Sequence, residues 1–338
     1  MTRSIQPLFL PCMIAASLGL MLGFFGSLHP AFDSFAHFRV HLAAVTAVLA
    51  LVLLFSPYRV LALSALVFAT SAFSSTTAAM RPPFGMAATA FPIKPADQAV
   101  YRLMELNLRY DNAAPEKVLS LIGRVQPDVV TLSEVSEMWE EKLNLLQSAY
   151  PNRIMCESRD PRFGVAVLSR RPFADGGEPS CHRLLSLTVT SVDFGGVAVD
   201  IGSLHLGWPW PFPQAEQLAD LRQPLSMLRD NAILAGDLNS TPWSAAAHDI
   251  AEAGGFAIVP SPGPTWIDRR LPHALLFAGL PIDNVFAKGD ITVHSIERLE
   301  PVGSDHVPLL VEFSLRPQPE EPEDERETAT VSREQLRS

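Results

Sequence analysis

The amino-terminal part of this chain carries almost no charge, and that feature constrains the fold more than any other. Between positions 8 and 75 the only charged side chains are Asp33, Arg39 and Arg59. A helix that crosses a membrane needs roughly 20 mostly apolar residues, because the hydrocarbon core is about 30 Å thick. A surface helix of a soluble protein keeps one polar face. The near-absence of charge on any face therefore favours membrane-spanning helices over a buried helical layer.

Three apolar segments within residues 1–80 are candidates for transmembrane helices: 8–28, 38–55 and 60–73. We expect about three spans, and two spans remain an alternative because the third segment is short. The first segment differs from a cleaved signal peptide, since its charged region is thin and further apolar segments follow at once. The basic residues that flank the segments are evenly divided between the two sides, so they do not fix the orientation.

The rest of the chain divides by composition into three parts. Residues 81–96 are rich in proline and small residues, as is typical of a linker. Residues 97–315 have ordinary globular composition, and residues 316–338 predict a disordered acidic tail. We expect an integral, multi-pass protein of the cell membrane, with its amino terminus inside and the large domain on the extracytoplasmic side.

Short apolar runs alternate with helical patterns across residues 97–315. Strands are expected at 100–106, 129–132, 165–168, 184–192, 197–204, 232–235, 282–287, 291–297 and 307–313. Helices are expected at 115–125, 138–147, 214–227 and 244–253. So many strands with so few helices between them predict an α/β fold with two packed sheets flanked by helices, and not a simple doubly wound sheet.

Polar or ionisable residues stand at the ends of these strands, one strand after another. They are Asn107, Glu134, His205, Asp237, Asn239, Asp283, Asp305 and His306. In layered α/β folds, ligand sites form where strand ends converge on one edge of a sheet. Carboxylates, amides and imidazoles without a cysteine cluster suit a hard cation such as Mg²⁺ or Mn²⁺. Each residue alone could equally begin a turn or a helix, and it is their number in one domain that favours a functional site.

Taken in order, these segments resemble the endonuclease/exonuclease/phosphatase superfamily, which includes pancreatic-type deoxyribonucleases, abasic-site endonucleases, neutral sphingomyelinases and inositol polyphosphate 5-phosphatases. The most specific pieces are Gly-Asp-Leu-Asn at 236–239 and Gly-Ser-Asp-His at 303–306. Segments 127–135 and 164–170 add support, and the resemblance runs from about 100 to 313. It implies a four-layer α/β sandwich of two mixed β-sheets flanked by helices. It also implies hydrolysis of a phosphodiester or phosphomonoester with Mg²⁺ or Mn²⁺ as cofactor.

The resemblance also implies roles for the residues on the metal side of the site. Glu134 would be the main metal-binding carboxylate, and Asn107 would hold metal-bound water or phosphate beside it. Asp305 would be a further ligand of the metal or of its water. Asp237 would orient or deprotonate the attacking water, and Asn239 would help to bind the phosphoryl group.

The histidines take the remaining roles that the resemblance implies. His306 would contact the scissile phosphate, with Asp283 orienting its ring. His205 would protonate the leaving group, as in the deoxyribonuclease branch. Arg109 departs from the pattern, because the abasic-site endonucleases carry an acidic residue there, which argues against a second tightly bound metal and the DNA-repair subtype.

Several alternatives stay open at the level of sequence. Segment 207–213 (GWPWPFP) is either an apolar lip over the site or a rigid loop packed on the core. A lip on a membrane-anchored domain would favour a lipid or lipid-linked substrate, and the arrangement resembles bacterial membrane-anchored members of the superfamily. Nucleic acid is possible as a substrate, but the net charge of −10 disfavours it. Cys156 and Cys181 either pair in an oxidising compartment or stay free.

A non-catalytic membrane receptor or scaffold that keeps the fold is the competing hypothesis from another class of protein. Its mark would be the loss of site residues. Apart from Arg109 the set is intact, which favours the enzyme.

Overall fold

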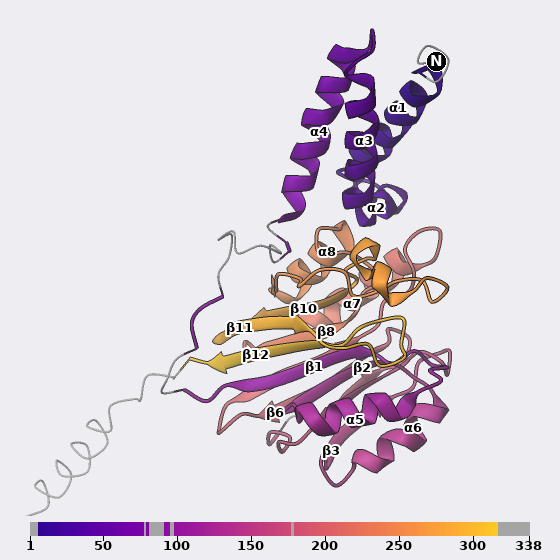
Figure 1. Cartoon of the computed structure of the whole chain (residues 1–338). Helices are drawn as coiled ribbons and strands as arrows, with labels where there is room; N and C mark the ends of the chain where they lie inside the picture. The colour runs from indigo at the N-terminus through magenta and orange to yellow at the C-terminus, as the bar shows by residue number, and fades with distance from the viewer. Residues whose placement is uncertain (1–5, 78, 81–90, 95–97, 177–178, 317–338) are drawn as a thin grey trace, which may run out of the picture.

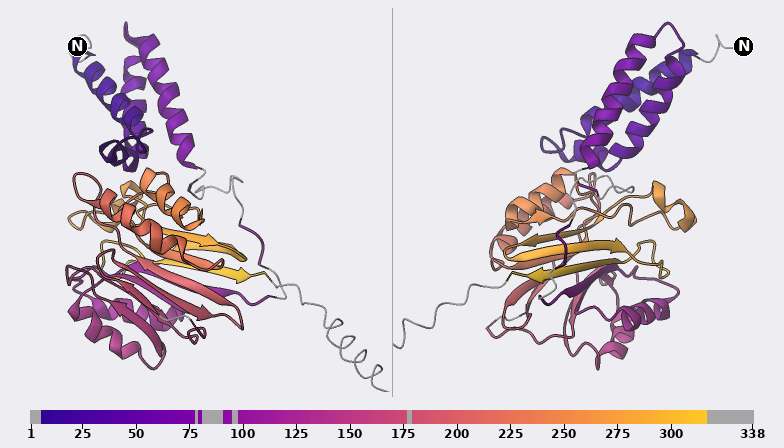
Figure 2. Two further views of the ribbon diagram at one scale, coloured as in Figure 1. Left: turned by 180° about the vertical axis from the view of Figure 1, so that it is seen from behind. Right: turned by 60° about the vertical axis from the view of Figure 1, so that its left-hand side comes forward.

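The computed structural model describes residues 6–77, 79–80, 91–94, 98–176 and 179–316. Helices from the amino-terminal part stand at one end of a body built on two β-sheets (Figure 1, Figure 2). The predicted tail beyond Arg316 and most of the predicted linker lie outside the described residues. Residues 91–94 of that linker lie against the body, where Lys94 forms an ion pair of 2.6 Å with Glu312 and the carbonyl of Pro92 contacts His294.

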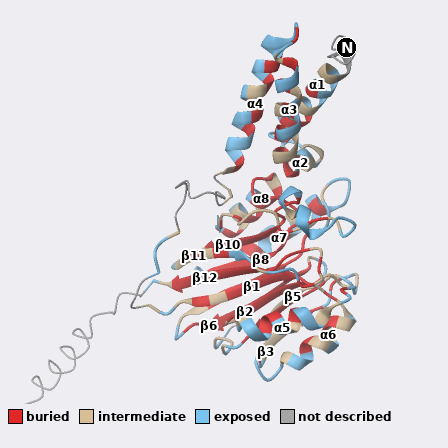
Figure 3. Cartoon of the chain, viewed as in Figure 1, coloured by how far each residue is buried: buried red, intermediate tan, exposed pale blue. Residues whose placement is uncertain are grey.

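The amino-terminal part contains four helices within the described residues. They are α1 (Gln6–Leu22), α2 (Pro30–His37), α3 (Arg39–Leu53) and α4 (Arg59–Thr77). Small residues such as Ala43, Ala50 and Ala62 are buried where α1, α3 and α4 pack together. Large apolar side chains such as Val48 and Val60 are exposed on the outside, where Figure 3 shows much pale blue. The apolar surface therefore faces outwards, the reverse of a soluble bundle.

The three predicted spans coincide with α1, α3 and α4, and the short helix α2 was not predicted. Within the described residues, only α4 is long and apolar enough to cross a membrane alone. Helices α2 and α3 meet the same criterion only as a pair bent by 67°, and the apolar stretch Phe9–Leu22 of α1 is shorter. By length and composition, the structure supports one or at most two spans, so the expectation of three is not supported.

The body consists of two six-stranded sheets within the described residues, with strand orders β11-β12-β1-β2-β4-β3 and β5-β6-β7-β8-β10-β9. The pairs β1–β2 and β7–β8 are parallel, and the other neighbours are antiparallel, so both sheets are mixed. The first sheet comprises β1 (Tyr101–Asn107), β2 (Val129–Val135), β3 (Asn152–Cys156), β4 (Gly164–Ser169), β11 (Ile291–Arg298) and β12 (Leu309–Leu315). The second comprises β5 (Ser180–His182), β6 (Leu187–Asp193), β7 (Ala198–Leu204), β8 (Ala232–Asp237), β9 (Ala257–Ile258) and β10 (Asp283–Lys288).

Helices cover the outer face of each sheet and complete four layers, as the resemblance implied. Helices α5 (Pro115–Val125) and α6 (Glu137–Leu143) pack on the first sheet. Helices α7 (Gln214–Ser226) and α8 (Ala245–Gly254) pack on the second. The core between the sheets includes Phe194 and Phe313. Because both faces of the central strands are covered, their sequences are near-continuous apolar runs.

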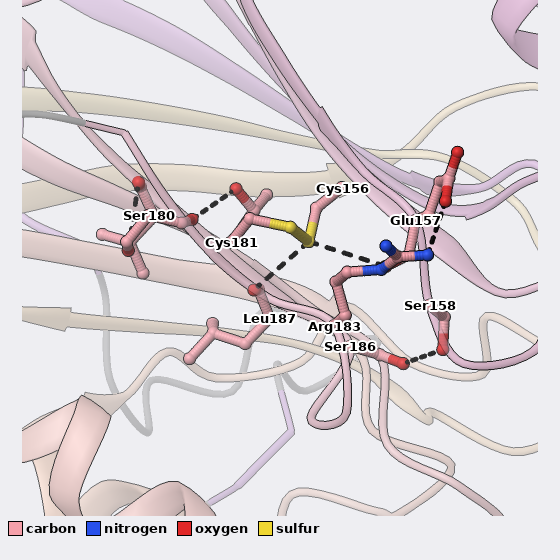
Figure 4. Close-up of a disulfide and its surroundings, with 10 residues drawn as sticks. Cys156, Glu157, Ser158, Ser180, Cys181, Arg183, Ser186 and Leu187 are labelled. Carbon is pink, nitrogen blue, oxygen red and sulfur yellow. Dashed lines mark hydrogen bonds and ion pairs between the residues drawn. A yellow bond between two sulfur atoms is a disulfide. The ribbon is translucent and has the colours of Figure 1, made fainter.

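The predicted strands and helices are all present, with ends shifted by up to a few residues. The helix expected at 138–147 is α6 followed by the 3-10 helix η1 (Asn144–Leu146), and the prediction missed the edge strands β3, β5 and β9 and the 3-10 helix η2 (His273–Ala278). A disulfide joins Cys156 at the end of β3 to Cys181 in β5, with a Cα–Cα distance of 5.5 Å (Figure 4). It therefore links the edge strands of the two sheets and resolves the alternative between paired and free thiols.

Helix α2 is the element that attaches the amino-terminal helices to the body. The buried carboxylate of Asp33 accepts hydrogen bonds from the backbone N–H groups of Ala245 (2.7 Å) and Ala246 (3.1 Å). The indole of Trp243 donates to the carbonyl of Ala36 at 2.7 Å. Beyond α4, the carbonyl of Ala79 accepts from the N–H of Ser261. Helix α2 thus lies on the segment that leads into α8, directly after the residues of the predicted site.

Candidate active site

The ends of strands from both sheets meet around one cavity of about 480 Å³. All eight predicted site residues lie at this place. Six of them line the cavity: Glu134, His205, Asp237, Asn239, Asp305 and His306. Asn107 and Asp283 lie directly behind it, each hydrogen-bonded to a lining residue. The convergence predicted from the strand ends is therefore present.

A β-bulge in β2 positions Glu134. The pairing of β2 with β4 shifts register between Ser133 and Val135, and Glu134 has a left-handed backbone with φ 57°. Such conformations are strained for residues other than glycine and persist where the surrounding structure imposes them, commonly at functional sites. The bulge re-aims one side chain of an otherwise regular strand, and here it directs Glu134 into the cavity.

Close contact between β7 and β8 positions Asp237. A Cβ on Gly236 would collide with the carbonyl oxygen of Leu204, so only glycine fits before Asp237. The Asp237 carboxylate accepts a hydrogen bond of 2.7 Å from the N–H of Asn239, which forms a tight turn. The amide nitrogen of Asn239 donates to the carbonyl of Leu206 at 2.8 Å. The Gly-Asp-Leu-Asn motif is thus a strand end followed by a turn that fixes both polar side chains.

Asn107 connects the two carboxylates on either side of the cavity. Its amide nitrogen lies 3.1 Å from Glu134 Oε1 and 2.9 Å from Asp237 Oδ2. Its amide oxygen accepts from the N–H of Arg109 at 2.9 Å. The other oxygen of Glu134 accepts from the N–H of Tyr110 at 2.9 Å. One residue of the first sheet therefore holds carboxylates from both sheets in a fixed relation.

His306 and Asp283 form a buried pair. His306 Nδ1 lies 2.9 Å and 3.0 Å from the two carboxylate oxygens of Asp283, and its Nε2 lies 3.6 Å from Asp237 Oδ2. Burial alone would lower the pKa of His306, but the charges of Asp283 and Asp237 outweigh it and hold the pKa well above its usual value. His306 is therefore a charged proton donor near neutral pH.

The other ionisable groups of the cavity have pKa values shifted by burial. Burial and the nearby charge of Asp283 raise the pKa of Asp237 to about 6. Burial also raises the pKa of Glu134. The pKa of His205 is lowered by burial, despite the opposing charge of Asp237 at 3.7 Å. At neutral pH, Asp237 is mostly ionised and His205 is neutral, so both can accept a proton.

Sequence reasoning gave no role to Glu105, which lies in the core beside the site. It is fully buried, and neither carboxylate oxygen has a hydrogen-bond partner among the described residues. Burial and the charge of Asp283 raise its pKa well above the usual value. Alternate residues of a strand share one face, so Leu103, Glu105 and Asn107 point the same way. A charged residue on that apolar face was the signal that could have identified it.

Further polar contacts support the site without having been predicted. Ser304 Oγ donates to the carbonyl of Asn107 at 2.8 Å and accepts from the N–H of His306 at 3.0 Å. The indole of Trp266 donates to Asp305 Oδ2 at 3.3 Å. Arg109 forms an ion pair with Asp111 at 2.7 Å. The Ser304 contacts tie the loop before β12 to the end of β1.

The donor set fits a hard divalent cation. Glu134, Asp237 and Asp305 supply carboxylate oxygens to the cavity. Among the described residues no Lys or Arg pairs with Glu134 or Asp237. Buried carboxylates need positive charge close by, and oxygen ligands favour hard cations. A divalent cation held by these carboxylates would supply that charge.

A site of this kind, in this fold, is that of a divalent-metal-dependent phosphoric ester hydrolase. Residues 104–306, more than half of the chain, match the model of the Endonuclease/Exonuclease/phosphatase family, and the chain belongs to this family. A search of curated protein sequences finds no match.

Solved structures share the fold of the body. An endonuclease/exonuclease/phosphatase from Bacteroides vulgatus has a TM-score of 0.54 and 17% identity, covering 65% of this chain and 100% of its own. One from Beutenbergia cavernae has a TM-score of 0.50 and 23% identity, covering 64% of this chain and 72% of its own. D. rerio TDP2, complexed with a single-strand DNA product, has a TM-score of 0.52 and 18% identity, covering 64% of this chain and 99% of its own. At these identities the likeness shows the fold alone.

Proposed function

We propose that this chain is a membrane-anchored phosphoesterase that uses Mg²⁺ or Mn²⁺ to hydrolyse a phosphodiester or phosphomonoester by in-line attack of an activated water. The observation that carries the proposal is the buried His306–Asp283 pair, whose His306 Nε2 lies 3.6 Å from Asp237 Oδ2 at the wall of a cavity lined with carboxylates. Within one cavity it combines a charged donor, a carboxylate base and oxygen ligands for a cation.

Each residue has a definite task in this proposal. Asp237, ionised at neutral pH, takes the proton of the attacking water. The charged His306 donates to a phosphoryl oxygen, and Asp283 keeps its ring oriented and protonated. Asn239 donates to the phosphoryl group. A phosphate ester brings negative charge beside His205, which raises the pKa of that imidazole and allows it to protonate the leaving oxygen.

Glu134, Asn107 and Asp305 would hold the cation. When bound, it supplies the positive charge that stabilises the phosphoryl oxygens during attack. The backbone carbonyl of Asn107 accepts a hydrogen bond from Ser304, and the carboxylate of Asp305 accepts one from Trp266. Two of the three residues that would hold the cation are therefore already fixed by neighbours. Such support orients ligands before the cation arrives.

Membrane anchoring is supported by the surface of the amino-terminal helices. Where α1, α3 and α4 pack together, the buried residues include many alanines, and large apolar side chains are exposed on the outside of the bundle, an arrangement that suits a lipid environment. Helix α1 begins at the end of the bundle away from the body (Figure 1). The disulfide between Cys156 and Cys181 supports an extracytoplasmic body, because disulfides persist in oxidising compartments.

The cavity lining favours a small or lipid-linked ester over nucleic acid. Acidic residues at its edge include Glu216 and Asp220, and Arg159 is its one arginine or lysine among the described lining residues. Tight, non-specific binding of nucleic acid depends on lysine and arginine at the phosphates. The TDP2 structure holds a DNA product, so DNA belongs among the substrates to be tested. The receptor or scaffold alternative has little support, because the eight polar residues are retained and converge.

The test uses the full-length chain in detergent with Mg²⁺ or Mn²⁺. Bis(p-nitrophenyl) phosphate, p-nitrophenyl phosphate and single-stranded DNA are the substrates, with His306→Ala and Asp237→Asn as variants and Ser34→Ala as a control outside the cavity. We expect turnover that depends on metal and is lost in both site variants but retained in the control. Turnover that survives chelation, or that persists in both site variants, would contradict the proposal.

A further inference from the structure

Two exposed apolar loops lie against the amino-terminal helices, and the first of them also borders the active site; we call them together the apolar rim. The first carries Trp208, Trp210 and Phe212, and the second carries Leu271, Leu275 and Phe277. Phe212 is 58% exposed and Phe277 is 75% exposed. A soluble surface rarely gathers so many large apolar side chains without a partner. The sequence alone left the first loop as either a lip or a rigid loop packed on the core, and its exposed side chains favour the lip.

Both loops are hydrogen-bonded to the amino-terminal helices. Ser34 Oγ on α2 donates to the carbonyl of Trp210 at 3.2 Å. On the other loop, the carbonyl of Ala278 lies 2.8 Å from His41 Nε2 on α3. These contacts lie where the helices reach the body (Figure 1). If the helices cross a bilayer, the apolar rim is therefore held at the level of its surface.

Exposed apolar side chains also occur on the amino-terminal helices beside these contacts. Phe35 and Phe38, next to the contacts just described, are also exposed, as is Leu28 in the turn before α2. Exposed residues (pale blue) gather at this end of the body in Figure 3. Aromatic side chains favour the interface between lipid and water. The exposed Arg269 and Arg270, next to Leu271, suit the anionic phosphates of lipid headgroups.

The rim also reaches the chemistry. Trp208 lines the cavity together with Asp237 and His306. Its ring packs edge-on against that of Trp266 at 5.8 Å, and Trp266 donates to Asp305. The same aromatic side chain thus belongs to the exposed rim and to the wall of the cavity.

From these contacts we infer that the apolar rim inserts into the surface of the bilayer that holds the helices, and that the substrate is a phosphate ester of a lipid in that bilayer. The inference rests on the proposed function and adds its substrate class. In the reaction the water oxygen forms a bond to phosphorus, the P–O bond to the leaving alcohol breaks, and the proton of water ends on that alcohol. The products are an alcohol and a phosphate that carries one ester bond fewer.

The experiment uses the full-length chain in vesicles of phosphatidylcholine and phosphatidylglycerol with Mg²⁺. The rim variant combines Phe212→Ser, Leu271→Ser and Phe277→Ser, none of which lines the cavity. The control combines Leu145→Ser and Met227→Ser, which are similarly exposed on other parts of the body. Turnover of soluble bis(p-nitrophenyl) phosphate and of the vesicle lipids is measured for each, together with quenching of tryptophan fluorescence by brominated lipid.

We expect the wild type to cleave a vesicle lipid, and the rim variant to lose about tenfold or more of that rate while keeping its rate on the soluble diester. The control keeps both rates, and brominated lipid quenches wild-type fluorescence more strongly than that of Trp210→Phe. Cleavage of the soluble diester without cleavage of either lipid would overturn the inference, as would equal lipid rates in rim variant and wild type, or equal quenching in wild type and Trp210→Phe. Absence of all turnover, soluble diester included, would instead overturn the proposed function, and the quenching would still report whether the rim inserts.

Discussion

The carboxylate of Asp33 accepts a hydrogen bond of 2.7 Å from the backbone N–H of Ala245, although 212 positions separate the two residues. Asp33 belongs to the apolar amino-terminal part, and Ala245 opens α8 in the catalytic body. The N-terminal N–H groups of a helix lack partners within the helix, and a negative charge at that end is stabilising. The amino-terminal helices therefore complete a helix of the body, directly after the segment that carries Asp237 and Asn239.

Replacing Asp33 by alanine is expected to destabilise the whole chain. It leaves the N–H groups of Ala245 and Ala246 without their acceptor in a buried place, which costs about 1–3 kcal/mol. Thermal unfolding in detergent should show a lower Tm for Asp33→Ala than for the wild type. Ser34→Ala is the matched control on the same helix, because Ser34 is only partly buried and its hydroxyl carries no charge. Equal Tm values for the two variants would show that the contact contributes nothing.

The pair of Asp283 and His306 predicts a shift in the pH dependence of turnover. His306 acts in its charged form, which is lost as the pH rises through its raised pKa. Asp283→Asn removes the charge that stabilises the imidazolium, so the alkaline fall in kcat/KM should move to lower pH. The acid side is set by Asp237, whose pKa is about 6, and turnover should rise as the pH increases through that value. An unchanged alkaline side in Asp283→Asn would contradict the assignment.

Replacing the buried Glu105 is expected to raise stability, whereas most substitutions of buried residues lower it. Its pKa is raised in the folded state, so folding favours the protonated form. The contribution of Glu105 to the free energy of unfolding is fully present below its pKa in the unfolded state, about 4.3. This contribution is lost as the pH rises through the pKa of Glu105 in the folded state. Glu105→Gln keeps the shape without the ionisation. In metal-free protein, its Tm relative to the wild type should therefore increase as the pH rises from 4 towards neutrality. A constant difference across that range would show that Glu105 does not titrate between the two states.

The sequence indicated the site residues because they stand at or next to the ends of strands, and their order resembles that of a known family. Asn107, Glu134 and Asp237 close strands, and a strand that is buried on both faces gives a strong local signal. Glu105 was given no role because it lies inside such a run, where its charge is hidden among apolar neighbours. Only the alternation of side chains along the strand indicates that it faces the other sheet.

The elements that the prediction missed have weak local patterns or distant partners. Strand β3 is only partly buried over most of its length, and β5 and β9 are shorter still, so neither alternation nor a continuous apolar run marks them. Helix α2 is short, and its buried Asp33 and His37 contact residues 241–246, far along the chain. No local pattern can reveal such a partner.

The disulfide between Cys156 and Cys181 predicts both a stability effect and a thiol state. It closes a loop with a sequence separation of 25, and its removal is expected to cost about 2–4 kcal/mol. It also holds β3 and β5 beside the loop whose Ser186 contacts Ser158 at the cavity edge. Cys156→Ser with Cys181→Ser should lower the Tm and remove its sensitivity to reducing agent, whereas Cys12→Ser, at an exposed and unpaired thiol among the described residues, should do neither.

Maleimide labelling of denatured protein from intact cells should modify Cys12 alone if the body lies in an oxidising compartment. Labelling of all three cysteines without added reductant would place the body in a reducing compartment and contradict the proposed orientation.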